Sequence, residues 1–297
     1  MKKILPTVTV GLSALNEQKN IKKLLKSVLS QKQESFDLKK IIVISDGSSD
    51  KTVEYAKSLG SKKITVKSYK TRKGKASRLN NIFSNLKTDI LIQVDADSIL
   101  ANKYVLENLI FPFIQDKKIA MTGGLAVPKV GETLIEKSIA TTVNVYTRMK
   151  HKVDSLSVNG CLLAYRSNFI KKIKLPENVH GDDIYTYLSC LSKGYKYRFV
   201  PEAIVNYKLP NTLSDHIKQN TRFLATPDTM QKYFSSDLLN KENHIPRGIF
   251  ISEIIKEFLH HPFLCSYIGI VNIYCKFKLK FSNHKMTSKW SIAKSTK

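Results

Sequence analysis

The stretch LIQVDADSIL, residues 91–100, places two carboxylates, Asp95 and Asp97, directly after an apolar run. Carboxylate oxygens are ligands that Mg²⁺ and Mn²⁺ prefer, together with water and phosphate oxygens. Two Asp residues at this spacing also occur in ordinary polar turns and helix caps. The apolar run before them favours the first interpretation, a metal site at the end of a buried strand.

Two other apolar runs also end in polar residues. TVTVGLSAL, residues 7–15, is followed by Asn16 and Glu17, and KKIIVIS is followed by Asp46 and a polar turn that reaches Asp50. Ligands of open parallel sheets bind at the carboxyl ends of the strands. Several carboxylates at one such edge repel each other unless a cation or hydrogen-bond donors share them. A divalent cation that also binds a diphosphate would satisfy this requirement.

The elements that would position these residues alternate along the first hundred residues. Strands are predicted from β-branched apolar runs, and helices from apolar residues at helical spacing with lysines on the opposite side. This alternation indicates an α/β fold, a mostly parallel sheet flanked by helices on both faces. The predicted strands cover 7–15, 39–46, 62–69 and 89–95, and the helices cover 16–31, 49–60 and 74–86.

The alternation is less regular further along the chain. Helices are predicted at 104–115, 132–153, 182–194 and 212–225, and strands at 119–128, 157–166 and 195–207. In the helix at 132–153, Ile135, Ile139, Val143 and Tyr146 form one apolar stripe. From about residue 229 the sequence changes to two apolar helical stretches, 248–259 and 262–275, followed by a lysine-rich tail.

The charge balance indicates an anionic partner. The chain has 49 Lys and Arg against 24 Asp and Glu, a net charge of +25, which suits nucleic acid, a phosphorylated substrate or a membrane surface. The alternative is a genome whose base composition favours lysine. Lysine is spread along the chain and the acidic strand ends would repel nucleic-acid phosphates, so no nucleic-acid partner is expected.

The cellular location of the protein is predicted from the lack of signal-peptide and spanning segments in this sequence and from its basic end. Residues 1–10 contain no long apolar region of a signal peptide, and the four cysteines form no CxxC pair, which is typical of a reducing compartment. No stretch reaches the roughly 18 uninterrupted apolar residues of a spanning helix. Residues 276–297 contain seven Lys and no acid, so this end is predicted to lie on the anionic inner membrane surface. The alternative is a helix packed on the catalytic domain with a frayed basic tail.

A basic turn, TRKGKASRLN at 71–80, precedes one of the predicted helices. Arg72, Lys73 and Lys75 near a helix N-terminus suit the phosphate or base of a nucleotide, although a solvated loop has the same composition. No GxxxxGK[ST] and no GxGxxG motif occurs. P-loop kinases and dinucleotide oxidoreductases are therefore disfavoured.

Two more groups of polar residues follow. Asp182 and Asp183 begin a predicted helix, where acids commonly cap the backbone and compensate the helix dipole. Gln219 and Arg222 lie three residues apart, on one helical face, and Phe223 follows them. An amide, a guanidinium and an aromatic ring together could clamp a diphosphate and stack on a sugar.

Taken in order, six segments resemble the motifs of family 2 inverting glycosyltransferases with the GT-A fold, of the cellulose, chitin and hyaluronan synthase-like branch. The segments span roughly residues 7–224; each is weakly specific, but their common order is more specific. The resemblance implies a GT-A catalytic domain over 1–228, and the apolar helices and lysine-rich tail beyond it predict a helical, basic, membrane-associated extension over 229–297. The segments are VGLSALNEQKNI, VISDGSSDKT, KGKASRLN, QVDADS, GDDIYTYLSCLSKGY and QNTRF.

The resemblance also implies roles for the residues at the matching positions. Glu17 and Asp46 help to hold the uridine end of the donor, and Asp95 and Asp97 form the motif that binds Mg²⁺ or Mn²⁺ and the diphosphate. From their charge, Lys75 and Arg222 are expected to add positive charge where the leaving diphosphate becomes more negative.

For the acceptor side, the resemblance implies that Asp183 is the general base, because the family places this acid 11 residues before the glycine that corresponds to Gly194. Asp182 takes the place of the acid that precedes the base. Gln219 and Arg222 fall on the family's Q-x-x-R-W motif.

The chain departs from the pattern in two respects. Phe223 replaces the usual tryptophan, and the spanning helices of the long processive synthases are not found. The resemblance then implies transfer of one or a few sugars from a nucleotide sugar, most simply a UDP-sugar, to a lipid-linked or saccharide acceptor in cell-surface polysaccharide or glycolipid synthesis. The enzyme would be cytoplasmic and peripheral on the inner face of the cell membrane.

Two related activities are alternatives. A dolichyl-phosphate mannose synthase-like transferase would use a lipid phosphate as acceptor, and the Gln219 and Arg222 pair argues against it. A sugar nucleotidyltransferase shares the parallel sheet and the acidic metal site, but it needs a glycine-rich basic segment near the N-terminus that LSALNEQKN does not provide.

Overall fold

The computed structural model describes residues 5–153, 158–281 and 294–297. The chain divides into two compact units. The first contains residues 1–127, 158–207 and 297, and the second contains residues 128–157 and 208–296. Each unit is described by itself.

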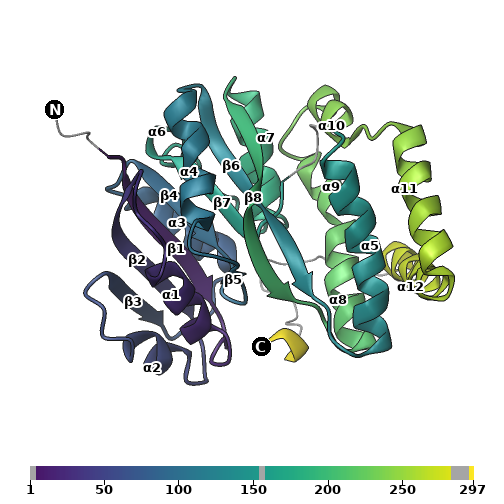
Figure 1. Ribbon diagram of the computed structural model, residues 1–297, viewed down its shortest axis with the longest axis horizontal. Helices are drawn as coiled ribbons and strands as arrows, with labels where there is room; N and C mark the ends of the chain where they lie inside the picture. The colour runs from purple at the N-terminus through teal and green to yellow at the C-terminus, as the bar shows by residue number, and fades with distance from the viewer. Residues whose placement is uncertain (1–4, 154–157, 282–293) are drawn as a thin grey trace. The chain divides into compact units, whose positions relative to one another are not determined.

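An eight-stranded sheet carries the candidate site of the first unit. Its first four strands in space are parallel, since β1 pairs with β2 and β4, and β2 pairs with β3. Strand β7 is antiparallel to β4 and β6, and β5 is antiparallel to β8. The sheet is therefore mixed and mostly parallel, as predicted (Figure 1). Its spatial order is β3 (Ile64–Tyr69), β2 (Asp37–Asp46), β1 (Thr7–Ala14), β4 (Ile90–Val94), β7 (Leu162–Arg166), β6 (Ile119–Lys129), β8 (Lys196–Lys208) and β5 (Ile99–Leu100).

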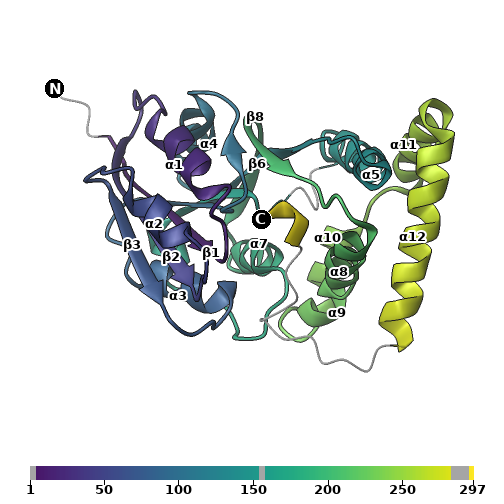
Figure 2. The same cartoon turned by 90° about the horizontal axis from the view of Figure 1, so that it is seen from below.

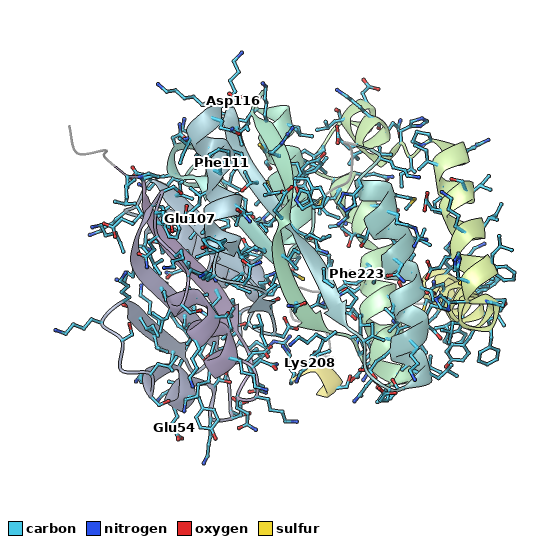
Figure 3. The ribbon with its side chains drawn as sticks, viewed as in Figure 1. Glu54, Glu107, Phe111, Asp116, Lys208 and Phe223 are labelled. Atoms are coloured by element: carbon cyan, nitrogen blue, oxygen red, sulfur yellow. The ribbon has the colours of Figure 1, made fainter. Side chains whose placement is uncertain are left out.

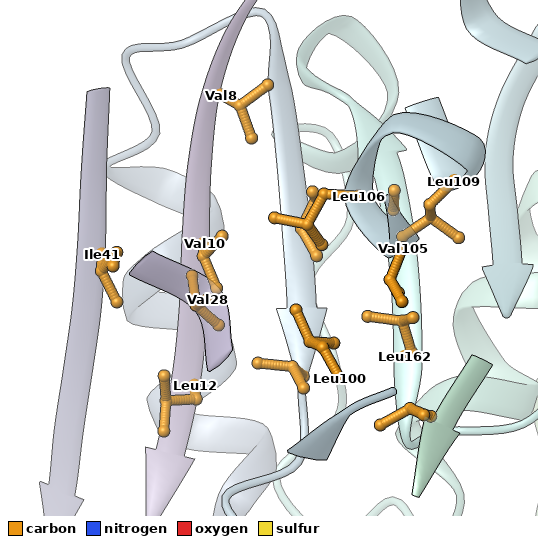
Figure 4. Close-up of a cluster of buried hydrophobic side chains, with 14 of the residues drawn as sticks. Val8, Val10, Leu12, Val28, Ile41, Leu100, Val105, Leu106, Leu109 and Leu162 are labelled. Atoms are coloured by element: carbon orange, nitrogen blue, oxygen red, sulfur yellow. The ribbon is translucent and has the colours of Figure 1, made fainter. Parts of the chain in front are cut away.

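Helices cover this sheet because its central strands have apolar residues on both faces. Every residue of β4 is buried. Figure 4 shows Val10 and Leu12 of β1 beside Val28 of α1, all fully buried, and burial of such side chains contributes roughly 1.5–3 kcal/mol each. The helices of this unit are α1 (Ile21–Leu29), α2 (Thr52–Lys57), α3 (Lys75–Ser84), α4 (Val105–Gln115), α6 (Ser167–Ile170) and α7 (Asp182–Ser192).

Glycines with positive φ begin the two helices that carry the most polar candidate residues. Gly74 precedes α3 with φ +94°, and Gly181 precedes α7 with φ +81°. Residues with a Cβ atom rarely adopt these angles. The two glycines therefore allow the chain to turn sharply and to place the first side chains of α3 and α7 next to the turn.

The second unit is helical. Helix α12 packs on α5 and α8, and α11 packs on α5 and α12, an arrangement that Figures 1 and 2 both draw. Within the described ranges, no helix is both long enough and apolar enough to cross a bilayer. Its helices are α5 (Leu134–Lys150), α8 (Leu213–Leu224), α9 (Thr226–Met230), α10 (Ser236–Asn243), α11 (Arg247–His260) and α12 (Pro262–Phe281), followed by a 3₁₀ turn, Lys294–Thr296.

The predicted stripe of α5 is only half right. Ile135 and Ile139 are buried, but Tyr146 is half exposed, and the buried face continues through Val145 and Met149 instead. With 3.6 residues per turn, the buried face of α5 that contains Ile139 reaches positions 145 and 146 two turns later. At these positions the smaller and more apolar Val145 is the buried residue.

Candidate functional site

The carboxyl end of β4 places Asp95 at the edge of the sheet in the first unit. The backbone N–H of Asp95 donates to the carbonyl oxygen of Cys161 (3.1 Å), and the N–H of Ser98 donates to the carbonyl oxygen of Asp95 (3.1 Å). These bonds fix the turn that contains Asp97. Both carboxylates are half-buried, so they are accessible to a ligand at this edge.

Lys75 links the strand end to two helices. It is the first residue of α3, and its Nζ lies 2.8 Å from Asp95 Oδ1 and 3.2 Å from Asp182 Oδ2. One ammonium group thus joins the carboxyl end of β4, the N-terminus of α3 and the N-terminus of α7. The structure brings Lys75, Asp95, Asp182 and the adjacent Asp183 together, although they are widely separated in the sequence.

Asp182 is oriented by a buried hydrogen-bond network. Gln93 Nε2 donates to Asp182 Oδ2 (2.9 Å), and the hydroxyl of Tyr165 donates to Gln93 Oε1 (3.3 Å). The same hydroxyl is 3.2 Å from Thr186 Oγ1, one turn further along α7. A buried carboxylate with such partners keeps one rotamer, so Asp182 holds the first turn of α7 against β4.

Asp183 faces the segment before β7. A methyl group added to Gly160 would lie 3.0 Å from Asp183 Oδ2, so only a glycine leaves this carboxylate its present space. Burial raises the pKa of Asp183, and the neighbouring charge of Asp182 raises it further. A half-buried carboxylate with a raised pKa is suited to accept a proton from a substrate.

The ionisation of Lys75 and Asp95 is coupled through their contact. Burial alone would lower the pKa of Lys75, but the charges of Asp182 and Asp95 outweigh it and hold that pKa well above its usual value. Burial raises the pKa of Asp95 to about 6, against the lowering effect of Lys75. Positive charge therefore stays at this edge throughout the neutral pH range.

Asp46, at the end of β2, holds the basic turn before α3. Its carboxylate accepts hydrogen bonds from the backbone N–H of Lys73 (2.9 Å), the N–H of Gly74 (2.7 Å) and Nε of Arg78 (2.5 Å). Asp46 and Arg78 are both buried. These contacts fix the start of α3 and with it the position of Lys75.

Glu17 follows β1 and is buried. Its backbone N–H donates to Thr52 Oγ1 (2.7 Å), and its carboxylate accepts from Asn20 Nδ2 (2.7 Å) and from Nζ of Lys297. Burial raises its pKa to about 7, and the charge of Lys297 opposes that rise. The negative charge of Asp97 also raises the pKa of Glu17.

Gln219, Arg222 and Phe223 lie on α8 of the second unit. The guanidinium carbon of Arg222 is 5.1 Å from the centre of the Phe223 ring. Phe223 is 55% exposed, and Figure 3 marks it on α8. The predicted helix and the one-turn spacing of the three residues are thus present in this unit.

The carboxylates fit a hard divalent cation that is shared with a substrate. Among the described residues, no group of three or more His, Cys, Asp or Glu side chains could hold a metal. Asp95 and Asp97 alone provide two oxygen ligands, and Mg²⁺ commonly combines one or two carboxylates with substrate phosphates and water. The donor set therefore suits an ion that arrives with a diphosphate.

Three residues of this site were not predicted from the sequence. Gln93 orients Asp182, Arg78 neutralises Asp46, and Tyr165 donates to Gln93. A signal for Gln93 does exist, because an amide inside the apolar run ILIQV must find a buried partner. Arg78 lies one helical turn after Lys75, on the same face.

The sequence pattern of glycosyl transferase family 2 matches residues 9–174. The chain belongs to this family. It is 27% identical over 233 residues to a probable glycosyltransferase of Bacillus subtilis, YdaM, with 74% of this chain and 55% of the relative covered. It is 24% identical over 273 residues to the poly-β-1,6-N-acetyl-D-glucosamine synthase of Staphylococcus aureus, with 88% of this chain and 64% of the relative covered. The chain thus spans less than two thirds of either relative's length.

Solved structures show the same fold. A mannosyltransferase of Pyrobaculum calidifontis, in complex with GDP-mannose and Mn²⁺, superposes with a TM-score of 0.68 at 15% identity, over 95% of this chain and 89% of that one. Glucosyl-3-phosphoglycerate synthase of Mycobacterium tuberculosis, in complex with Mn²⁺, UDP and phosphoglyceric acid, superposes with a TM-score of 0.54 at 17% identity, over 74% and 78% of the two chains. The predicted GT-A fold is confirmed.

Proposed function

We propose that this glycosyltransferase is an inverting enzyme that moves a hexosyl or N-acetylhexosaminyl group from a nucleotide sugar, most simply a UDP-sugar, to a hydroxyl group of a lipid-linked or saccharide acceptor. The observation that carries the proposal is the junction at Lys75. Lys75 brings together Asp95, the carboxylate proposed to bind the metal and the diphosphate, and Asp182 with Asp183, the pair proposed to contain the general base. All of them lie at one edge of the sheet.

On the donor side, Glu17 and Asp46 contribute to the nucleoside end and Lys75 to the diphosphate. Asp95 and Asp97 would hold Mg²⁺ or Mn²⁺. When bound, the ion supplies positive charge that stabilises the leaving diphosphate. Lys75 adds a fixed ammonium group at the same edge, and its raised pKa keeps it charged. The Mn²⁺ complexes of similar structures support this arrangement.

On the acceptor side, Asp183 is the general base. The acceptor oxygen attacks the anomeric carbon from the face opposite the leaving group, its proton passes to the Asp183 carboxylate, and the bond to the diphosphate oxygen breaks. Configuration inverts. Asp182, held by Gln93 and Lys75, fixes the turn that presents Asp183. The residues proposed to bind the acceptor and the diphosphate on α8 are Gln219, Arg222 and Phe223.

The cellular setting is part of the proposal. We assign residues 1–228 to catalysis and residues 229–297 to attachment at the anionic inner face of the cell membrane, where a lipid-linked acceptor is available. The polysaccharide synthase among the relatives supports a role in cell-surface polysaccharide or glycolipid synthesis.

A donor panel tests the proposed reaction. The chain is incubated with UDP-glucose, UDP-N-acetylglucosamine and GDP-mannose, each with Mg²⁺ or Mn²⁺, and with or without a membrane lipid extract. Release of a nucleoside diphosphate that depends on both the ion and the extract is expected. Release of pyrophosphate instead would identify a nucleotidyltransferase, and transfer only to a lipid phosphate would identify the mannose synthase-like alternative.

A further inference from the structure

Helix α11 is inverted relative to an ordinary surface helix. Its buried residues are Glu253, which is 0% exposed, and Glu257. Its apolar residues recur in pairs four residues apart and point away from the unit, and Leu259 is 74% exposed. Surface helices normally bury the apolar stripe and expose the acids. The exposed apolar residues are Phe250, Ile251, Ile254, Ile255, Phe258 and Leu259.

Ion pairs with α5 and its end hold α11 in this orientation. Arg148 Nε lies 2.7 Å from Glu253 Oε2, and Arg148 Nη1 lies 2.8 Å from Glu257 Oε2. Lys152 Nζ lies 2.5 Å from Glu253 Oε1, and Asn144 Nδ2 donates to Glu257 Oε1 (3.1 Å). Turning the apolar side inward would break all of these contacts and separate the buried carboxylates of Glu253 and Glu257 from the cations that neutralise them. The outward apolar stripe is therefore a fixed feature of the fold.

Helix α12 continues this exposed surface. It buries Ile268, Val271 and Cys275, which lie on one helical face. Figures 1 and 2 draw α11 and α12 next to each other on the same side of α5, and the two helices pack on one another. We call the exposed apolar residues of both helices the apolar surface of α11 and α12. Those of α12 are Phe263, Ile270, Ile273, Tyr274, Phe277 and Phe281.

We propose that the apolar surface of α11 and α12 is a docking face for an anionic lipid bilayer, with its side chains inserted at the boundary between the headgroups and the acyl chains. A patch of twelve large apolar side chains is far more than isolated exposure on a monomer. Lipid is the occupant that fits because residues 258–297 contain seven Lys and no Asp or Glu. Basic residues beside an inserted apolar face are typical of interfacial helices on anionic lipid.

Charge also argues against a second copy of this chain as the occupant. Each copy has a net charge of +25, and the surface is bordered by Lys276, Lys278 and Lys280 in the last turns of α12. Two such faces would repel each other, whereas anionic headgroups attract them. The proposal deepens the membrane attachment that the proposed function assigns to residues 229–297, because it names the residues that would contact the lipid.

Vesicle flotation tests the docking face without any sugar transfer, so its failure and a failure of the proposed reaction are distinguishable. The full chain is floated with phosphatidylcholine vesicles and with vesicles containing 30% phosphatidylglycerol. The test variant is Ile255→Ser, Leu259→Ser, Phe277→Ser. The matched control removes three exposed apolar side chains elsewhere, as Phe111→Ser, Val130→Ser, Leu134→Ser (Phe111 is marked in Figure 3).

The wild type and the control are expected to float with the anionic vesicles, and the test variant is expected to lose about a hundredfold or more in partition coefficient while its thermal unfolding stays unchanged. Wild-type chain that does not float, or a test variant that floats like the wild type, would overturn the proposal. A wild type that elutes as a dimer and a test variant that elutes as a monomer, with neither floating, would assign the face to a second copy instead.

Discussion

At the scale of single residues, the ammonium group of Lys75 joins three chain segments: the end of β4, the start of α3 and the start of α7. Its two ion pairs, at 2.8 and 3.2 Å, offset the repulsion between Asp95 and Asp182. Glycine at 74 and the Asp46 carboxylate place it there. The residues that position Lys75 are thus as necessary to the site as the carboxylates themselves.

Substitution of Lys75 by Gln is expected to destabilise the protein more at pH 8 than at pH 5. Without the ammonium group, the buried Asp95 carboxylate loses its cationic partner, and because burial raises the pKa of Asp95 to about 6, its unpaired negative charge is present at pH 8 but mostly absent at pH 5. The free energy of unfolding is expected to fall by about 2 kcal/mol at pH 8. This loss is smaller than for a fully buried ion pair, because the side chains of Lys75 and Asp95 are both partly exposed. Urea unfolding at both pH values measures it.

Lys73→Gln is the control for this variant, because Lys73 is exposed and contributes only its backbone N–H to Asp46. Equal losses for the two variants, or a Lys75 effect that does not grow with pH, would contradict the assigned contacts.

Glu17 is expected to make the protein less stable as the pH rises from about 4.5 to 7. Its pKa is raised from 4.5 to about 7 in the folded state, so the folded state binds more protons than the unfolded state in this window. The destabilisation is therefore absent below pH 4.5 and complete above pH 7, at roughly 3 kcal/mol. Glu17→Gln should remove it, which is measured as a difference in unfolding free energy between variant and wild type at pH 4.5 and pH 8. A pH-independent difference would contradict the burial of this carboxylate.

The sequence predicted the strand-end carboxylates but not their partners. Asp95, Asp97 and Glu17 could be predicted because apolar runs lead directly into them. The pairing of Gln93 with Asp182 and of Arg78 with Asp46 could not be predicted, because the partners are distant in the chain and only the folded sheet brings them together. The roles assigned to all of these residues stay predictions.

At the scale of elements, close packing between β6 and β8 explains the glycine at position 124 of β6. A Cβ atom on Gly124 would lie 2.4 Å from the carbonyl oxygen of Ala203, a backbone atom that cannot move aside. Such a position requires glycine because the neighbouring backbone approaches closely.

Gly124→Ala is therefore expected to lower the free energy of unfolding by about 2 kcal/mol or more, measured by urea unfolding. Gly269→Ala is the matched control, since a Cβ at that position in α12 meets no atom within 4 Å. The control should be neutral or more stable by up to about 1 kcal/mol because alanine favours the helix. A neutral Gly124→Ala would show that the two strands can separate there.

The periodicity of apolar residues predicted which segments are helices and which are strands. It did not predict the short elements or which face of each helix is buried. Most long helices and strands were predicted within about three residues, but α1 begins five residues later than predicted and α10 was not predicted. The predicted helix at 104–115 continues through Pro112 as α4. The two-residue strand β5 and the short helices α6 and α9 contain too few residues for a period to appear. The inverted face of α11 could not be predicted, because amphipathic spacing alone places the apolar side inward.

At the scale of the whole molecule, binding of the donor nucleotide is expected to raise the stability of the folded chain. The first unit gathers its carboxylates and Lys75 at one edge, where a nucleoside diphosphate and a cation would neutralise each other's charge. A ligand that binds only the folded chain raises its stability by about 2.7 kcal/mol at 100 times the Kd.

The expected outcome is a rise in thermal unfolding temperature with UDP and Mn²⁺ together, and little change with UDP and a chelator. The double variant Asp95→Asn, Asp97→Asn should lose the ion-dependent part of the rise. An equal rise in the presence of the chelator would contradict the metal and diphosphate role of the two carboxylates.

The general base is tested most directly by Asp183→Asn in a single-turnover transfer assay, with donor affinity measured in parallel by calorimetry. The variant keeps the shape of the side chain but cannot accept the acceptor's proton. The rate of sugar transfer should fall by about a thousandfold or more, with donor affinity within a few-fold of wild type. Transfer at the wild-type rate would contradict the assignment of Asp183 as the base and with it the proposed mechanism.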